Sequence, residues 1–241
     1  MPAIVEADDD GMYVLKFRGA AQGPKALVAE LLAGELGRAV DLPVPEIVLI
    51  QLDTDLARTE ADPEIQDLIR ASGGLNVALD YLPGAVTFDP VTYQPPAPLA
   101  SAIVWFDAFV MNVDRTARNT NMLMWHRKLH LIDHGAALYF HHSWSEDYLE
   151  RSRDPFTRIR DHVLLPFASA LQEAHESMLE RLTPQLVHSL VASIPDELLT
   201  SDPTFASPGE YRTAYERWLL RRLQSPHDFF TEALRAHAQL V

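Results

Sequence analysis

The spacing of apolar residues along the first eighty positions predicts short strands around one long helix. Residues 3–7 and 12–18 alternate apolar and polar side chains on either side of an aspartate-rich turn ending at Gly11, a pattern typical of a β-hairpin. From Pro24, a favoured first helical residue, apolar side chains recur at helical spacing as far as Leu36. The same patterns predict three further elements: strands over residues 46–52 and 74–82, and a short helix over residues 63–71. This end of the chain is therefore expected to be a small α+β unit.

The pattern changes after residue 82. Five prolines fall in residues 83–98, where periodicity is weak, and we expect a linker there. Beyond it a strongly apolar segment covers residues 101–111, a β-pair is expected over residues 121–125 and 128–133, and helices are expected over most of residues 154–241. The predicted organisation has three parts: an N-lobe over residues 1–82, the linker over 83–98 and a mainly helical C-lobe over 99–241.

Composition excludes several classes of function. The chain has 241 residues, and 20 lysines and arginines against 34 aspartates and glutamates leave a formal net charge of −14. This charge repels a phosphate backbone, so we expect no direct binding of nucleic acid. No apolar run approaches the ~18 residues of a membrane span, and the acidic start of the chain differs from a signal peptide. The expected location is cytoplasmic, without membrane contact, and the absence of cysteine removes disulfides and thiol chemistry.

The segment from residue 112 to residue 135 has the spacing of a phosphoryl-transfer site. Asp114 is followed five residues later by Asn119 in a polar loop, and the predicted β-pair then leads to Asp133 with Gly135 two residues on. In kinases a loop aspartate accepts the proton of the attacking hydroxyl, while an asparagine and a second aspartate hold Mg²⁺. Aspartate and asparagine are also common in turns, so agreement from the other lobe is needed.

That agreement comes from a lysine on the second predicted strand. Alternation places Val14 and Lys16 on one face of that strand, as in kinases that use a strand lysine to reach the nucleotide phosphates. Glu30 on the following helix can supply the ion pair that holds such a lysine. The alternatives are a solvated edge lysine and a surface glutamate.

At this point the sequence resembles the HipA-like kinases over nearly its whole length. The segments that carry the resemblance are Tyr13 to Phe17, Gly19 to Pro24, Asp41 to Glu46, Gly74 to Gly84, Asn112 to Asn119 and Leu131 to Gly135. The resemblance implies a two-lobed protein-kinase-like fold of the α+β class, with a small mixed N-lobe and a larger, mainly helical C-lobe. It implies a phosphotransferase that uses ATP and Mg²⁺, with Ser or Thr of a protein as the acceptor.

The resemblance also implies roles for individual residues. Asp114 would be the catalytic aspartate, Asn119 and Asp133 would bind Mg²⁺, and Lys16 would contact the phosphates with Glu30 as its partner. The expected contacts to adenine are the hinge residues Asp80, Tyr81 and Leu82, together with Val14 and Leu123 as apolar walls.

Arg115 directly follows the proposed catalytic aspartate. We count it with the catalytic group because arginine offers planar, bidentate donors to phosphate oxygens. The alternative is an ion pair with a local carboxylate such as Asp107.

One departure from the family pattern concerns the phosphate loop. Family members carry a glycine- and serine-rich loop before the strand that opens this sequence, which starts at Met1. Either the start is truncated, or residues 19–23 grip the phosphates in its place, or the protein binds nucleotide poorly. Toxin members also carry an amino-terminal subdomain and act with a DNA-binding antitoxin, and this chain is expected to lack that subdomain.

Two other functions compete with the kinase. His126 and His130 are four residues apart, a spacing that would share a helix face in a metallohydrolase, although the predicted β-pair and the missing H-E-x-x-H glutamate oppose this. His134 is interpreted as a positioning residue next to Asp133. A pseudokinase that binds nucleotide without transfer is the second alternative. The missing upstream glycine loop favours it, and the complete set of Asp114, Asn119 and Asp133 opposes it.

Overall fold

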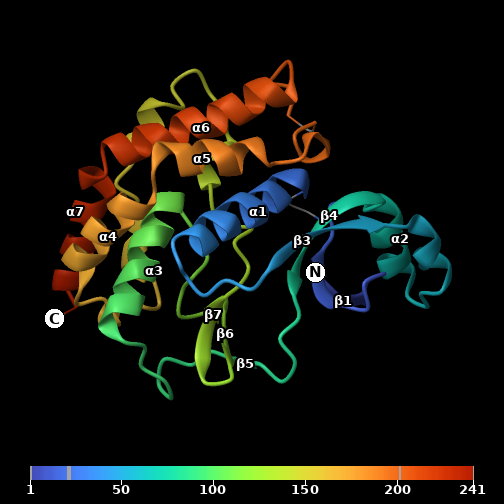
Figure 1. Ribbon diagram of the computed structural model, residues 1–241, viewed down its shortest axis with the longest axis horizontal. Helices are drawn as coiled ribbons and strands as arrows, with labels where there is room; N and C mark the ends of the chain where they lie inside the picture. Colours follow the sequence, from blue (N-terminus) through green and yellow to red (C-terminus); the bar gives the residue numbers. More distant parts are fainter. Residues whose placement is uncertain (1, 21–22, 201, 241) are drawn as a thin grey trace.

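The computed structural model describes residues 2–20, 23–200 and 202–240 and has an α+β fold (Figure 1). A small antiparallel sheet lies at one side of the molecule, and most of the helices gather at the other side. The first part of the chain contains β1 (Pro2–Glu6), β2 (Met12–Lys16), α1 (Gly23–Ala39), β3 (Ile47–Leu52), the 3-10 helix η1 (Thr54–Arg58), α2 (Pro63–Ala71) and β4 (Gly74–Asp80). The predicted strands and helices of this region are therefore present, with ends shifted by at most three residues.

The sheet of the N-terminal part has the strand order β1-β2-β4-β3, and all of its pairs are antiparallel. In register, Ile4 lies opposite Val14, which lies opposite Leu79. Because side chains alternate along a strand, Lys16 shares this face, and Leu15 points to the reverse face. The reverse face packs on η1 and α2 around Leu15, Phe17, Leu52, Ala57, Ile69 and Ala78.

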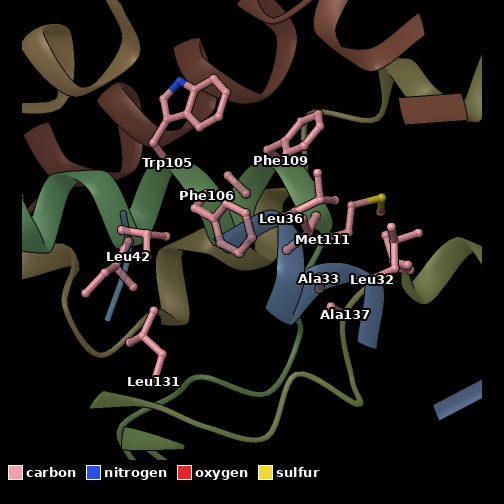
Figure 2. Packing of buried hydrophobic residues seen from close by; sticks show 14 of the residues in the cluster. Leu32, Ala33, Leu36, Leu42, Trp105, Phe106, Phe109, Met111, Leu131 and Ala137 are labelled. Atoms are coloured by element: carbon pink, nitrogen blue, oxygen red, sulfur yellow. The ribbon is translucent and has the colours of Figure 1, made fainter. Parts of the chain in front are cut away.

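The helix α1 belongs to the main hydrophobic core rather than to the small sheet alone. It begins at Gly23, next to the predicted start at Pro24, and its side chains are buried on almost every side. It packs against β3 and β4, and also against α5 (Pro184–Ala192) of the helical region. Figure 2 shows Leu32 and Leu36 of this helix beside Phe106 and Met111 in one continuous cluster. The core therefore crosses the boundary between the predicted lobes.

The segment predicted as a linker contains regular structure. Its strand β5 (Val86–Thr87) pairs with β6 (Met122–Trp125), which pairs with β7 (Lys128–Leu131). Helix α3 (Ala97–Val110) begins inside the predicted linker because Pro98 occupies its first turn, where proline needs no hydrogen-bond partner. The predicted linker therefore includes a two-residue strand and the first two residues of α3, and its place as the boundary between two lobes stays a prediction.

The last third of the chain is less helical at its beginning than predicted. Residues 154–170 form the short 3-10 helices η4 (Thr157–Asp161) and η5 (Leu165–Phe167). A left-handed backbone at Phe156, with φ 54°, and Pro166 prevent a continuous helix there. The helices that follow are α4 (Leu171–Arg181), α5, α6 (Pro208–Gln224) and α7 (His227–Ala238). No helix in the described ranges combines the length and apolar character that crossing a bilayer requires.

Candidate active site

An ion-pair cluster joins the small sheet, α1 and the segment after β7. The Lys16 ammonium pairs with the carboxylate of Glu30, and its Nζ lies 2.5 Å from Oδ1 of Asp133. The Glu30 side chain is fully buried, whereas the Asp133 side chain is 49% exposed. The interpretations of Glu30 as a surface glutamate and of Lys16 as a solvated edge lysine are therefore excluded, because the two side chains form an ion pair with little exposure to solvent.

The charges in this cluster stabilise one another. Burial by itself would raise the pKa of Glu30, but the Lys16 ammonium and His134 outweigh it and lower the pKa to about 2. Burial would lower the pKa of Lys16, yet Glu30 and Asp133 raise it above its ordinary value. A permanent ammonium is thus presented at the cleft. His134 is buried with its Nδ1 3.7 Å from Oε1 of Glu30, and its positioning role next to Asp133 stays a prediction.

The loop between α3 and β6 places the candidate catalytic aspartate. Its backbone closes on itself, since the amide of Thr116 donates to the carbonyl oxygens of Asp114 and Asn119, both at 2.9 Å. The side-chain amide of Asn119 donates to Oδ2 of Asp114 at 2.6 Å, and that of Asn121 donates to the same oxygen at 3.1 Å. Asn121 was not singled out from the sequence; its position at the end of the polar loop was the available signal. Two amides therefore fix the orientation of the Asp114 carboxylate.

Arg115 lies beneath this loop and does not reach the cleft, which corrects its assignment to the catalytic group. Its side chain is fully buried, its Nε lies 2.6 Å from Oδ2 of Asp107, and its Nη1 donates to the carbonyl oxygen of Asn121 at 2.5 Å. His162 approaches the same Asp107 oxygen at 2.9 Å. Burial would raise the pKa of Asp107, but Arg115 and His162 lower it to about 2. Arg115 is thus buried in a structural contact, and the alternative ion pair with Asp107 is the one that forms.

The two halves of the site meet at a cavity of about 500 Å³. Lys16 lines it from the sheet, and Asp114 and Asp133 line it from the other side. Three residues that the sequence analysis did not assign also line it: Tyr139, His142 and Arg158. They lie 25 or more residues after Asp114 without a recognisable spacing, so only the fold brings them to the site. Asn119 and Leu123 line a neighbouring cavity of about 410 Å³.

The predicted adenine contacts are only partly gathered. Val14 shares the sheet face of Lys16, together with the exposed Ile4, which the sequence analysis missed. The amide of Asp80 donates to the carbonyl oxygen of Glu46 at 2.8 Å, and that of Tyr81 donates to Met12 at 3.0 Å. These two amides are therefore committed within the protein, and the prediction that main-chain groups of the hinge meet adenine stays a prediction for the remaining groups.

Other adenine predictions stay untested. Leu82 is buried, and neither Leu82 nor Val14 lines the cavity of about 500 Å³ or the cavity of about 410 Å³. The substitute phosphate loop over residues 19–23 includes residues 21 and 22, which lie outside the described residues. Gly23 lines the larger cavity, so part of that loop does reach the site.

The histidine alternative has no geometry to support it. His126 lies at the exposed turn between β6 and β7, with φ 47°, and His130 lies within β7 opposite Leu123. They therefore do not share a helix face. Within residues 2–20, 23–200 and 202–240, no three histidine, cysteine or acidic side chains are grouped as a metal would require.

The structure combines a strand lysine paired with a helix glutamate, a loop with an aspartate and an asparagine, and a second aspartate after a β-hairpin. This combination is typical of a kinase-like phosphotransferase fold. The family model described as HipA-like kinase matches residues 1–233, and the chain belongs to this family. Membership implies a kinase-type phosphotransferase that uses ATP.

The structure is also similar to the crystal structure of a Helicobacter pylori proinflammatory kinase, CtkA. The TM-score is 0.58 at 13% sequence identity, and the match covers 99% of this chain and 94% of that chain. At this identity the likeness shows the fold alone. No curated protein sequence matches the chain significantly.

Proposed function

We propose that this protein transfers the γ-phosphate of ATP, in a Mg²⁺-dependent reaction, to a hydroxyl group, with Ser or Thr of a protein as the acceptor. The observation that carries the proposal is the meeting of Lys16, Asp114 and Asp133 at one cavity, with Glu30 holding the lysine from behind. Catalysis in such a site is positioning and neutralisation of charge, with little covalent work for the protein.

Each residue of the site has a distinct task in this proposal. Asp114 receives the proton of the acceptor hydroxyl: both neighbouring amides donate to its Oδ2, and among the described residues its Oδ1 accepts no hydrogen bond. Lys16 contacts the phosphates, and Glu30 keeps it charged and extended toward them. The Asp107–Arg115 pair holds the catalytic loop against the start of β6 through the carbonyl oxygen of Asn121.

The donor set fits Mg²⁺. This ion prefers hard oxygen ligands and is commonly held by one or two carboxylates together with phosphate oxygens and water. Asp133 offers a half-exposed carboxylate at the cavity. Asn119 lines the neighbouring cavity and donates through Nδ2, and within the described ranges its Oδ1 accepts no hydrogen bond. When bound, Mg²⁺ would neutralise charge on the transferring phosphate.

The test measures ATP binding by calorimetry and transfer of radiolabelled γ-phosphate to a library of Ser- and Thr-containing peptides, with and without Mg²⁺. Asp114→Asn keeps the side-chain shape and removes the base, so we expect transfer to fall by roughly 10²-fold or more while ATP binding persists. Asp10→Asn is the matched control, because Asp10 lies in an exposed turn with φ 63°, a conformation that asparagine tolerates.

Two results contradict the proposal. Equal transfer by the wild type and Asp114→Asn would remove Asp114 from the reaction. Tight ATP binding without transfer in any arm would favour the pseudokinase. The same assay with small hydroxyl compounds in place of the peptides shows whether the acceptor of the phosphate is a protein or a small molecule.

A further inference from the structure

A second large groove lies on the reverse face of the small sheet, away from Lys16. Because β2 alternates, Tyr13 and Leu15 point to this side, while Val14 and Lys16 point to the cleft. The helices η1 and α2 cover one end of the face, and the other end is open as a groove of about 940 Å³. Its apolar lining comes from separate strands and from η1: Val5, Tyr13, Leu15, Val48, Ile50 and Leu56.

Several of these apolar side chains are solvent-accessible. Leu56 is 52% exposed, and Val5, Val48 and Ile50 are only partly buried. A sheet face that is covered at one end and accessible at the other presents apolar side chains that the apolar side chains of a partner can contact.

The rim of the groove is acidic. Five carboxylates line it, and the lining contains no lysine or arginine: Glu6, Asp8, Asp9, Asp53 and Asp55. Three of the five have a local partner, since Asp9 accepts from the hydroxyl of Tyr13, Asp53 accepts from a backbone amide, and Asp55 pairs with Arg58. Glu6 and Asp8 form no ion pair with any residue in the described part of the chain. The rim therefore keeps a strong excess of negative charge.

We propose that this groove docks a segment of a partner protein in which apolar side chains are flanked by lysine or arginine. The apolar floor needs apolar anchors, and the carboxylates at the rim attract cations and exclude anions. Nucleic acid and anionic lipid carry the wrong charge, and a second copy of this chain, at −14, is repelled as well. Electrostatic complementarity thus favours a basic, amphipathic partner segment over these other occupants.

Docking at this groove is independent of the proposed phosphoryl transfer, because it uses the opposite face of the sheet. An occupant would contact β2, the strand that carries Lys16, without entering the nucleotide cleft. A failure to detect phosphoryl transfer would not contradict docking at the groove, and a failure to detect docking would not contradict phosphoryl transfer.

The test uses a short fluorescent peptide of leucine and lysine as the probe and follows its anisotropy on titration with the full chain. We expect binding that weakens with added salt. The rim variant Glu6→Lys with Asp8→Lys should lower the affinity by roughly tenfold or more. The matched control is Glu173→Lys with Glu180→Lys, two exposed positions on α4 that change the net charge equally. This control should retain binding within about twofold.

Three outcomes would overturn the inference. Equal loss of affinity in the rim variant and the control would reduce the binding to overall charge. A peptide with serine in place of leucine that binds equally well would show that the apolar floor is not used. Sedimentation that reveals dimers of the wild type, abolished by Leu56→Arg at an exposed position, would assign the groove to a second copy instead.

Discussion

Removal of the buried charge of Arg115 tests whether this residue positions the catalytic loop rather than binding substrate. In Arg115→Met the side chain keeps much of its volume, but the fully buried Asp107 loses its main cation. Breaking a buried ion pair in this way costs about 3–5 kcal/mol. Lowering the pKa of Asp107 from 3.8 to about 2 corresponds independently to roughly 2–3 kcal/mol of preference for the ionised form. We therefore expect Arg115→Met to lose about 3 kcal/mol of stability at neutral pH.

The loss should depend on pH in a defined direction. In the wild type the depressed pKa of Asp107 contributes stability that is present above pH 3.8 and lost as the pH falls toward 2. In the variant the unpaired, buried carboxyl has a raised pKa and is neutral in acid. The difference between the two proteins should therefore be largest near pH 7 and shrink steadily in acid.

Urea denaturation of both proteins from pH 3 to pH 8, followed by tryptophan fluorescence, measures this difference. Arg118→Met is the matched control, because Arg118 belongs to the same loop and is exposed. Combining Arg115→Met with Asp107→Leu should recover part of the loss, since both charges are then absent. A loss below about 1 kcal/mol at pH 7, or one that does not change with pH, would refute the buried-pair assignment.

Two further predictions concern the same fold. Glu30→Gln removes the buried carboxylate that pairs with Lys16. Because the pKa of Glu30 is lowered from 4.5 to about 2, its contribution to stability is present above pH 4.5 and lost as the pH falls toward 2. The variant should therefore be less stable at pH 7 by roughly 3–4 kcal/mol and should bind ATP more weakly, and unchanged denaturation and calorimetry would contradict the ion pair. Gly19→Ala would place a Cβ 2.7 Å from the Cβ of Ala71 and 2.9 Å from its backbone, so thermal unfolding should show a loss of stability of about 1–3 kcal/mol. The control Gly209→Ala, whose added Cβ has its nearest neighbour at 3.8 Å, should be nearly neutral. Equal melting temperatures of the two variants would show that the backbone around Gly19 moves to accommodate the methyl group.

Local patterns were sufficient for most elements of the fold. The alternation in β2 correctly separated Val14 and Lys16 from Leu15, because the side-chain period of a strand is two wherever one face is buried. The helix from Pro24 was correct as well, since proline and the leucine spacing both act within a few residues. The start of α3 inside residues 83–98 was not predicted, because proline is compatible with a linker and also with the first turn of a helix.

Some residues of the candidate site could likewise be predicted from local spacing, and others could not. Asp114, Asn119 and Asp133 stand at spacings that could be recognised along the chain, and the structure brings Asp114 and Asp133 to one cavity with Lys16. Arg158 and Tyr139 reach that cavity only through the tertiary fold, so no local pattern pointed to them.

Arg115 shows why residue type and proximity in sequence are insufficient to assign chemistry. An arginine next to a catalytic aspartate suits a phosphate equally well as a carboxylate, because its planar donors bind both. The choice depends on where Asp107 points, and Asp107 lies eight residues earlier on the buried side of α3. Since α3 is apolar almost throughout, a charged residue within it requires a buried partner, and Arg115 and His162 meet that requirement. A lone carboxylate in an apolar helix is thus the stronger signal, and it assigns the neighbouring arginine to structure before any ligand is considered.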